Sequence, residues 1–194
     1  MRCTTPHKII LTCLSLALLN GCMTTAVVAG ASALTATALY DQRSFKTMSQ
    51  DHTTTTFINE KVAENETLQS TDVSVKTINH NTLLVGRVRT PEQRVRIYKI
   101  AQSAPHVRRI YNKLTVTQKD SAIDGAKDVW LAGHVQTALL QKKGLRSAQV
   151  TPIVNHGVVY LMGILPNAQQ ALATDAVRKV PGVKKVVTLF ENRV

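Results

Sequence analysis

The sequence predicts an α/β (α+β) protein built from two copies of one small unit, each with the element order α-β-β-α-β. The first observation is a repeat: the segments Thr82–Val88 and Val159–Leu165 align when the chain is shifted by 77 positions, which places Gly86 on Gly163. The second is that apolar residues recur in both copies with helical spacing and then as short apolar runs. Each copy is therefore expected to form a three-stranded mixed sheet packed by two helices.

The repeat also sets the expected domain boundaries. The first domain is predicted over residues 53–118 and the second over residues 128–194, with a short polar linker at 119–127. Later in each copy the shift falls to 76, because Ala104–Ile110 matches Val180–Val186. One residue has therefore been lost from the second copy between these two landmarks.

The first half of the second copy shows its elements clearly. A helix is expected from Asp128, placed as its N-cap, to Gly144, which would end it. A strand over Gln149–Val154 follows, and a tight turn at Asn155-His156-Gly157 leads into the apolar strand Val158–Met162. The sequence therefore predicts a helix followed by a β-hairpin.

The second half of that copy supplies the other helix and the last strand. Pro166 lies near the start of the helix, where its missing N–H costs nothing. Leu172, Ala176 and Val180 recur every fourth residue and give the helix one core-facing stripe. Pro181-Gly182 then ends the helix, and the apolar segment after it is predicted to be the third strand.

The chain begins like an export signal. Arg2 and Lys8 precede an apolar core, Ile9–Leu19, that is shorter than the roughly 20 residues needed for a membrane span. The residues Leu19-Asn20-Gly21-Cys22 then resemble the lipobox of bacterial lipoproteins. An ordinary signal peptide that happens to contain a cysteine is the alternative.

The lipobox resemblance implies cleavage before Cys22 and acylation of that residue. Residues 1–21 are then a lipoprotein signal peptide, and residues 22–52 a lipidated tether and linker. The tether holds a second apolar stretch, Met23–Tyr40, but its small side chains bury little area each, so no membrane span is expected there. Met23 rather than Asp follows Cys22, which by similarity to the lipoprotein sorting rule implies the outer membrane.

The chain is strongly basic. Its formal net charge is +12, and removal of the signal with Arg2 and Lys8 leaves +10. Export excludes nucleic acid as the partner of this charge, so the polyanion that the protein would meet is an anionic phospholipid surface. A solvated basic surface with no specific ligand is the alternative.

The two copies resemble the BON domain, a small bacterial α/β module. The features that carry the resemblance are the glycines that end the second strand, Gly86 and Gly163, and the segment Gly182-Val183-Lys184-Lys185-Val186 before the last strand. The first copy departs from this pattern, with His106 in place of the last glycine. Together with the lipobox, the resemblance implies a monomeric, lipid-anchored lipoprotein with two BON domains on the periplasmic face of the outer membrane.

One helix face distinguishes the two copies. With about 100° per residue, Leu131, Val135 and Leu139 form a core stripe of the helix that begins the second copy. The opposite face carries no charge; it consists of Val129, Trp130, Gly133, Thr137 and Leu140. The equivalent residues of the first copy are an ordinary polar surface: His52, Thr53, Thr56, Glu60 and Ala63.

An uncharged outward face with the single tryptophan favours a membrane or partner contact. Lys142 and Lys143 follow at the helix end, where they could meet lipid phosphates. The family resemblance implies that the second BON domain binds anionic phospholipid through this helix and supports envelope integrity. Two alternatives remain: Trp130 packs against the first copy, or the face docks a protein, which would make the chain an adaptor for envelope assembly or division machinery.

The sequence favours neither an enzyme nor a cofactor or metal protein. It has no nucleophile elbow, no phosphate-binding glycine loop and no closely spaced acidic pair in a plausible pocket. His80 and His156 lie in the two hairpin turns, but isolated histidines do not make a ligand set. The expectation is therefore no catalytic residue, no metal and no cofactor, with Gly86, Gly163 and Gly182 serving the fold.

Overall fold

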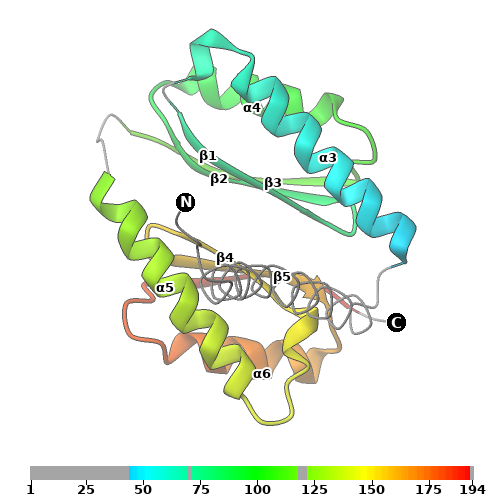
Figure 1. The fold of residues 1–194 in the computed structure, drawn as a ribbon, viewed down its shortest axis with the longest axis vertical. Coiled ribbons are helices and arrows are strands. Elements are labelled where there is room, and N and C mark those ends of the chain that lie inside the picture. Colours follow the sequence, from blue (N-terminus) through cyan, green and yellow to red (C-terminus); the bar gives the residue numbers. More distant parts are fainter. Residues whose placement is uncertain (1–43, 70, 118–121, 193–194) are drawn as a thin grey trace, which may run out of the picture. The chain divides into compact units, whose positions relative to one another are not determined.

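The computed structural model describes residues 44–69, 71–117 and 122–192 (Figure 1). The predictions about the signal peptide, Cys22 and most of the tether lie outside the described residues. Within them the chain forms two α/β units, called here the first and the second domain.

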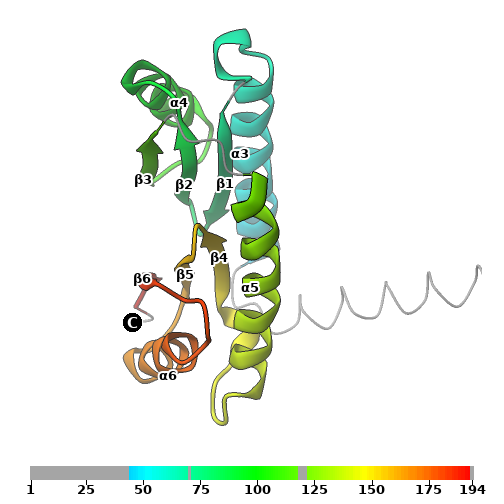
Figure 2. The ribbon, with the colours of Figure 1, turned by 90° about the vertical axis from the view of Figure 1, so that its left-hand side faces the viewer.

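The first domain has the predicted order of elements. They are α3 (Phe45–Ala63), a short 3-10 helix (Glu66–Leu68), β1 (Asp72–Ile78), β2 (Asn81–Val88), α4 (Pro91–Ser103) and β3 (Arg109–Val116). The sheet order is β1-β2-β3, with β1 antiparallel and β3 parallel to the central strand. Both helices cover the same face of this sheet (Figure 2).

The second domain repeats this arrangement. Its elements are α5 (Ala122–Gln141), a 3-10 helix (Ser147–Gln149), β4 (Thr151–Asn155), β5 (Val158–Ile164), α6 (Asn167–Arg178) and β6 (Lys185–Glu191). The sheet order is β4-β5-β6, again with one antiparallel and one parallel pair. The predicted fold class, two α-β-β-α-β units with three-stranded mixed sheets, is confirmed.

Alternate residues of each central strand serve two different cores. In β5, Val159 and Leu161 point toward α5 and α6 and are fully buried with Val135 and Leu139. Tyr160 and Met162, on the other face, join a separate apolar cluster with residues of the first domain. Because both faces of the strand are covered, it reads as a continuous apolar run rather than as an alternating pattern.

The cluster between the two sheets is built from equivalent parts of both domains. Leu83 and Val85 of β2 meet Tyr160 and Met162 of β5, and all four side chains are buried. Polar contacts lie beside it: Glu191 accepts hydrogen bonds from Asn79 and from Arg108, and Arg87 Nη2 lies 2.8 Å from His156 Nδ1. The sheets thus hold the two domains together.

Both long helices begin earlier than the sequence predicts. α5 starts at Ala122, inside the segment expected to be the linker 119–127, and α3 starts at Phe45, inside the expected tether and linker. The prediction that Asp128 is the N-cap of its helix is therefore wrong. The boundaries of the two domains stay a prediction.

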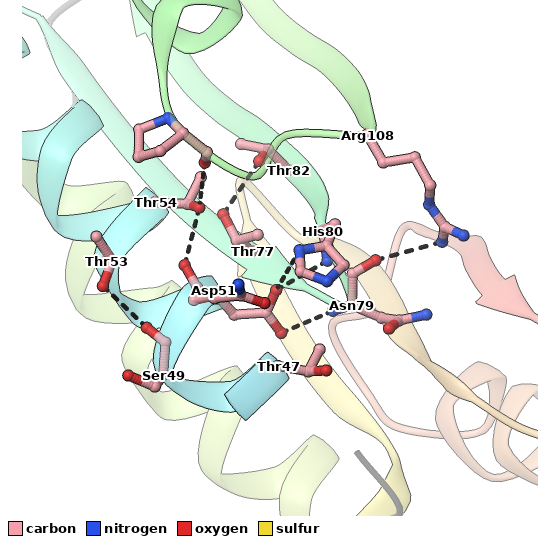
Figure 3. A network of polar contacts seen from close by, with 12 residues as sticks. Thr47, Ser49, Asp51, Thr53, Thr54, Thr77, Asn79, His80, Thr82 and Arg108 are labelled. Atoms are coloured by element: carbon pink, nitrogen blue, oxygen red, sulfur yellow. Dashed lines mark hydrogen bonds and ion pairs between the residues drawn. The ribbon is translucent and has the colours of Figure 1, made fainter. Parts of the chain in front are cut away.

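Asp128 instead binds the β4–β5 hairpin turn. Its carboxylate accepts the backbone N–H groups of His156 at 2.5 Å and Gly157 at 3.0 Å. Asp51 on α3 does the same in the first domain, accepting from Asn79 at 2.7 Å and His80 at 2.8 Å (Figure 3). Both turn residues of each hairpin have positive φ, and the carboxylate satisfies the N–H groups that this turn leaves unpaired.

Asp128→Ala is expected to lower the free energy of unfolding by about 1–3 kcal/mol, because two turn N–H groups lose their acceptor. Asp128→Asn keeps one acceptor oxygen and should cost less. Urea unfolding of the two variants checks this order. Equal stability of Asp128→Ala and the parent chain would contradict the role assigned to the carboxylate.

The glycines that end β2 and β5 allow a close backbone approach. A Cβ on Gly86 would overlap the carbonyl oxygen of Asp72, and one on Gly163 would overlap that of Gln149. Both glycines also have positive φ, +125° and +152°. At both positions a side chain is therefore excluded by the lack of space and also by the backbone conformation.

Candidate functional site

The face of α5 opposite its core stripe is exposed. Leu131, Val135 and Leu139 are at most 3% exposed. On the other side Val129 is 76% exposed, Trp130 54% and Leu140 64%, and Gly133 and Thr137 are exposed between them. We call Val129, Trp130, Gly133, Thr137 and Leu140 the apolar face of α5. The structure brings all five together as the helical spacing predicts.

The indole of Trp130 is held against the second domain rather than free in solvent. Its ring lies over that of His134, with centroids 3.9 Å apart and an interplanar angle of 35°. His134 Nδ1 also lies 2.9 Å from the carbonyl oxygen of Trp130. The far edge of the indole approaches Gly182. A large apolar side chain is thus fixed in an exposed position, which lowers the entropy lost when it binds.

Two hollows lie beside Trp130. One runs between α5 and the end of α6, with a volume of about 620 Å³, and is lined by Trp130, Thr137, Lys179 and Val180 among others. The other, of about 280 Å³, lies toward the hairpin turn and is lined by residues that include Lys127, Trp130, Gly157, Gly182 and Lys184. We call the second hollow the glycine pocket.

Trp130 does not make the contact between the domains. The cluster that joins the two sheets consists of strand residues, among them Leu83 and Tyr160, whereas the neighbours given above for Trp130 all belong to the second domain. The alternative in which Trp130 packs against the first copy therefore has no support. The corresponding helix surface of the first domain is polar: Thr53 is exposed and its hydroxyl donates to Ser49 O at 3.0 Å (Figure 3).

Lys142 and Lys143, the two lysines expected to contact lipid, differ in their surroundings. Lys143 is exposed. The ammonium of Lys142 lies 2.6 Å from the carboxylate of Asp175 on α6, which also pairs with Lys179 at 2.9 Å. Lys142 is thus directed to α6 and away from the apolar face of α5. The sequence alone did not identify Lys127, Lys179 and Lys184, which line the two hollows. For Lys184, its place two residues after Gly182 was the feature that could have indicated such a position.

Asp175 is expected to titrate near pH 2. Hydrogen bonds from Lys142 and Lys179 hold the pKa of its carboxyl at about 2, below the ordinary 3.8. A pKa that is lower in the folded chain stabilises the fold above the unfolded-state value, and this contribution is lost as the pH falls through the folded value. An NMR titration of the carboxyl carbon measures the midpoint. Lys142→Gln should raise it, and an unchanged midpoint would rule out the pair.

The described part of the chain has no helix both long and apolar enough to cross a membrane. Among the same residues, no three His, Cys, Asp or Glu side chains are grouped so that they could hold a metal ion.

Comparison with known proteins defines the family to which this fold belongs. The family model for the BON domain matches residues 50–118 and 127–192. The chain therefore belongs to the BON-domain family, with two such domains in tandem, and is a lipoprotein of the DolP type.

The relatives cover most of the chain. It is 30% identical over 175 residues to the "Outer membrane lipoprotein DolP" of Haemophilus influenzae, covering 89% of each chain. It is 28% identical over 118 residues to the "21 kDa hemolysin" of Actinobacillus pleuropneumoniae, covering 61% of each. It is also 28% identical over 139 residues to the "Osmotically-inducible protein Y" of Escherichia coli, covering 70% of this chain and 69% of that protein. These similarities support a lipoprotein that acts in the cell envelope.

Proposed function

We propose that this protein is an outer-membrane-anchored periplasmic lipoprotein that binds anionic phospholipid through α5 of its second domain and thereby supports envelope integrity. The anchor would be the acylated Cys22. The observation that carries the proposal is the apolar face of α5, on which Val129, Trp130 and Leu140 are all more than half exposed. The proposal includes no catalytic role and a monomeric protein.

The apolar face has the composition of a surface that enters the interfacial region of a bilayer. Trp130 has an apolar ring with one N–H donor, which suits the depth of the lipid head groups. Val129 and Leu140 would bury their exposed area among the upper acyl carbons. Gly133 and Thr137 between them bring no charge that would have to be desolvated.

Cations around this face supply the preference for anionic lipid. Lys127 on α5 and Lys143 just after its end are exposed. Lys179, which follows α6, and Lys184, which precedes β6, are exposed as well. The full sequence has a formal net charge of +12, and the chain without residues 1–21 keeps +10, so the protein as a whole is attracted to a negatively charged surface. The similarity to a protein named as an outer membrane lipoprotein is consistent with a position close to a lipid surface.

The second candidate is a protein-interaction adaptor for envelope assembly or division machinery. The hollow between α5 and α6 favours it, because a partner side chain could enter beside Trp130 and Val180. Binding to pure lipid vesicles discriminates the two, since an adaptor would need a protein partner.

The mature chain with Cys22→Ser, which cannot be acylated, is expected to bind vesicles containing phosphatidylglycerol and to bind phosphatidylcholine vesicles much more weakly. Vesicle flotation at rising salt concentration measures this. Salt should weaken the binding and leave a residual apolar part, because only the Coulomb attraction is screened. Absence of binding to either vesicle would favour the adaptor.

A further inference from the structure

Two of the residues that line the glycine pocket are glycine where the first domain carries histidine. Gly157 of the β4–β5 turn corresponds to His80, and Gly182 before β6 corresponds to His106. In the first domain the two imidazole rings lie near each other, with centroids 6.4 Å apart. All four residues have positive φ, so the backbones match while the side chains differ. The second domain thus lacks both imidazole rings, and the side chains of Lys184, Leu131 and Trp130 lie beside the two glycines.

Lys184 lines this pocket beside Gly157. The methylene stem of Lys184 passes so close to Gly157 that a Cβ there would lie 3.0 Å from Lys184 Cδ. Its ammonium donates to the carbonyl oxygen of His156 at 3.3 Å, and further N–H bonds remain for a ligand. The glycine therefore positions the lysine, which stays exposed at its charged end.

The other groups of the pocket complete an anion site with an apolar side. Lys127 lines it from α5, and Trp130 and Leu131 supply apolar surface. Asp128 also lines it, but its two carboxylate oxygens already accept the N–H groups of the hairpin turn. His156 contributes to the lining and faces Arg87 through Nδ1. Two lysines and one internally bonded carboxylate leave a net positive pocket.

We infer that the glycine pocket binds the phosphate-bearing head group of a single anionic phospholipid, with Lys127 and Lys184 on the phosphate and the glycerol beside Trp130. This inference rests on the proposed function and deepens it. Lysine ammonium groups are common phosphate binders. Trp130, which would lie at the depth of the head groups, forms one wall, so a lipid in the outer part of the bilayer could reach the pocket. The ammonium of a zwitterionic head group would meet the like charge of the two lysines, which disfavours such a lipid.

The first arm of the test uses short-chain dihexanoyl-phosphatidylglycerol below its micelle concentration, titrated into the Cys22→Ser mature chain. The backbone amides of Gly157 and Gly182 should shift in a saturable manner. Lys127→Gln and Lys184→Gln should each weaken this binding about tenfold, because each removes a charge-assisted contact. Lys185→Gln is the matched control: it removes the same charge from an exposed neighbour that does not line the pocket, and should have little effect.

The second arm fills the pocket. Gly157→His together with Gly182→His gives the second domain the residues of the first, whose backbone has the same positive φ. This double variant should keep its α/β circular dichroism and lose the saturable shifts. If it fails to fold, the lysine variants still decide the question.

Three results would overturn the inference. One is an equal effect of Lys184→Gln and Lys185→Gln on lipid binding. Another is binding of glycerol 3-phosphate as tight as that of the lipid, which would assign the pocket to a free phosphate compound. The third is loss of vesicle binding in Trp130→Glu with no effect of the lysine variants, which would leave the membrane proposal standing without the pocket. If Trp130→Glu also binds vesicles normally, the proposed function falls as well.

Discussion

Trp130→Glu should weaken binding of the mature chain to phosphatidylglycerol vesicles about 100-fold, a loss of about 3 kcal/mol. The variant removes an apolar ring from the exposed face of α5 and places a carboxylate against the negative lipid surface. The stability of the fold should change by no more than about 1 kcal/mol, because the side chain is 54% exposed and lies outside the core. Vesicle flotation and urea unfolding measure the two effects separately.

Two control variants separate charge from apolar contact. Trp130→Ala removes the ring without adding charge, so it should weaken vesicle binding less than Trp130→Glu does. Thr53→Glu makes the equivalent change on α3 of the first domain, whose surface is polar, and should bind as the parent chain does. If Trp130→Glu unfolds the second domain, or if Thr53→Glu reduces binding equally, the apolar face of α5 is not the lipid-binding surface.

Gly163→Ala should destabilise the second domain by roughly 3–5 kcal/mol, since it adds a steric overlap to a strained backbone conformation. The new Cβ would overlap the carbonyl oxygen of Gln149, which is main chain and cannot rotate away as a side chain could. The end of β5 would have to separate from the segment before β4. Urea unfolding with Trp130 fluorescence as the probe reports on this domain.

Gly133→Ala is the matched control for that prediction. Gly133 lies on α5 with nothing within 4 Å of the position that a Cβ would take. Alanine there should stabilise the helix by about 0.5–1 kcal/mol, because glycine is the poorer helix former. Similar unfolding midpoints for the two variants would show that the close approach at Gly163 is absent.

The elements of both domains could be predicted from the sequence because their apolar residues are periodic and repeat at a fixed shift. Leu131, Val135 and Leu139 identified the buried stripe of α5, and the same spacing placed Trp130 on the opposite face. Trp130 was recognisable as a candidate because its counterpart, Thr53, is polar. One internal comparison thus located the face, while its function stays a proposal.

Other features depend on contacts between residues far apart in the sequence. Asp128 looks like an N-cap in isolation, and only the folded hairpin shows that it binds the turn at Gly157. Lys142 looks like a free cation at a helix end until α6 brings Asp175 within 2.6 Å. The helix starts at Phe45 and Ala122 were missed because the first turns of both helices do not continue the apolar period of the core stripe.

The centre of the contact between the two sheets comes from equivalent positions of each copy, since Leu83 and Val85 lie 77 residues before Tyr160 and Met162. In this respect the contact resembles the isologous contacts that close homodimers. A chain with a single copy would expose this apolar patch and could cover it only by pairing with another molecule, to an extent set by concentration. When both copies belong to one polypeptide, the apolar patch of one sheet meets that of the other at an effective concentration in the mM range. The pairing of the sheets is therefore independent of how many molecules the membrane holds.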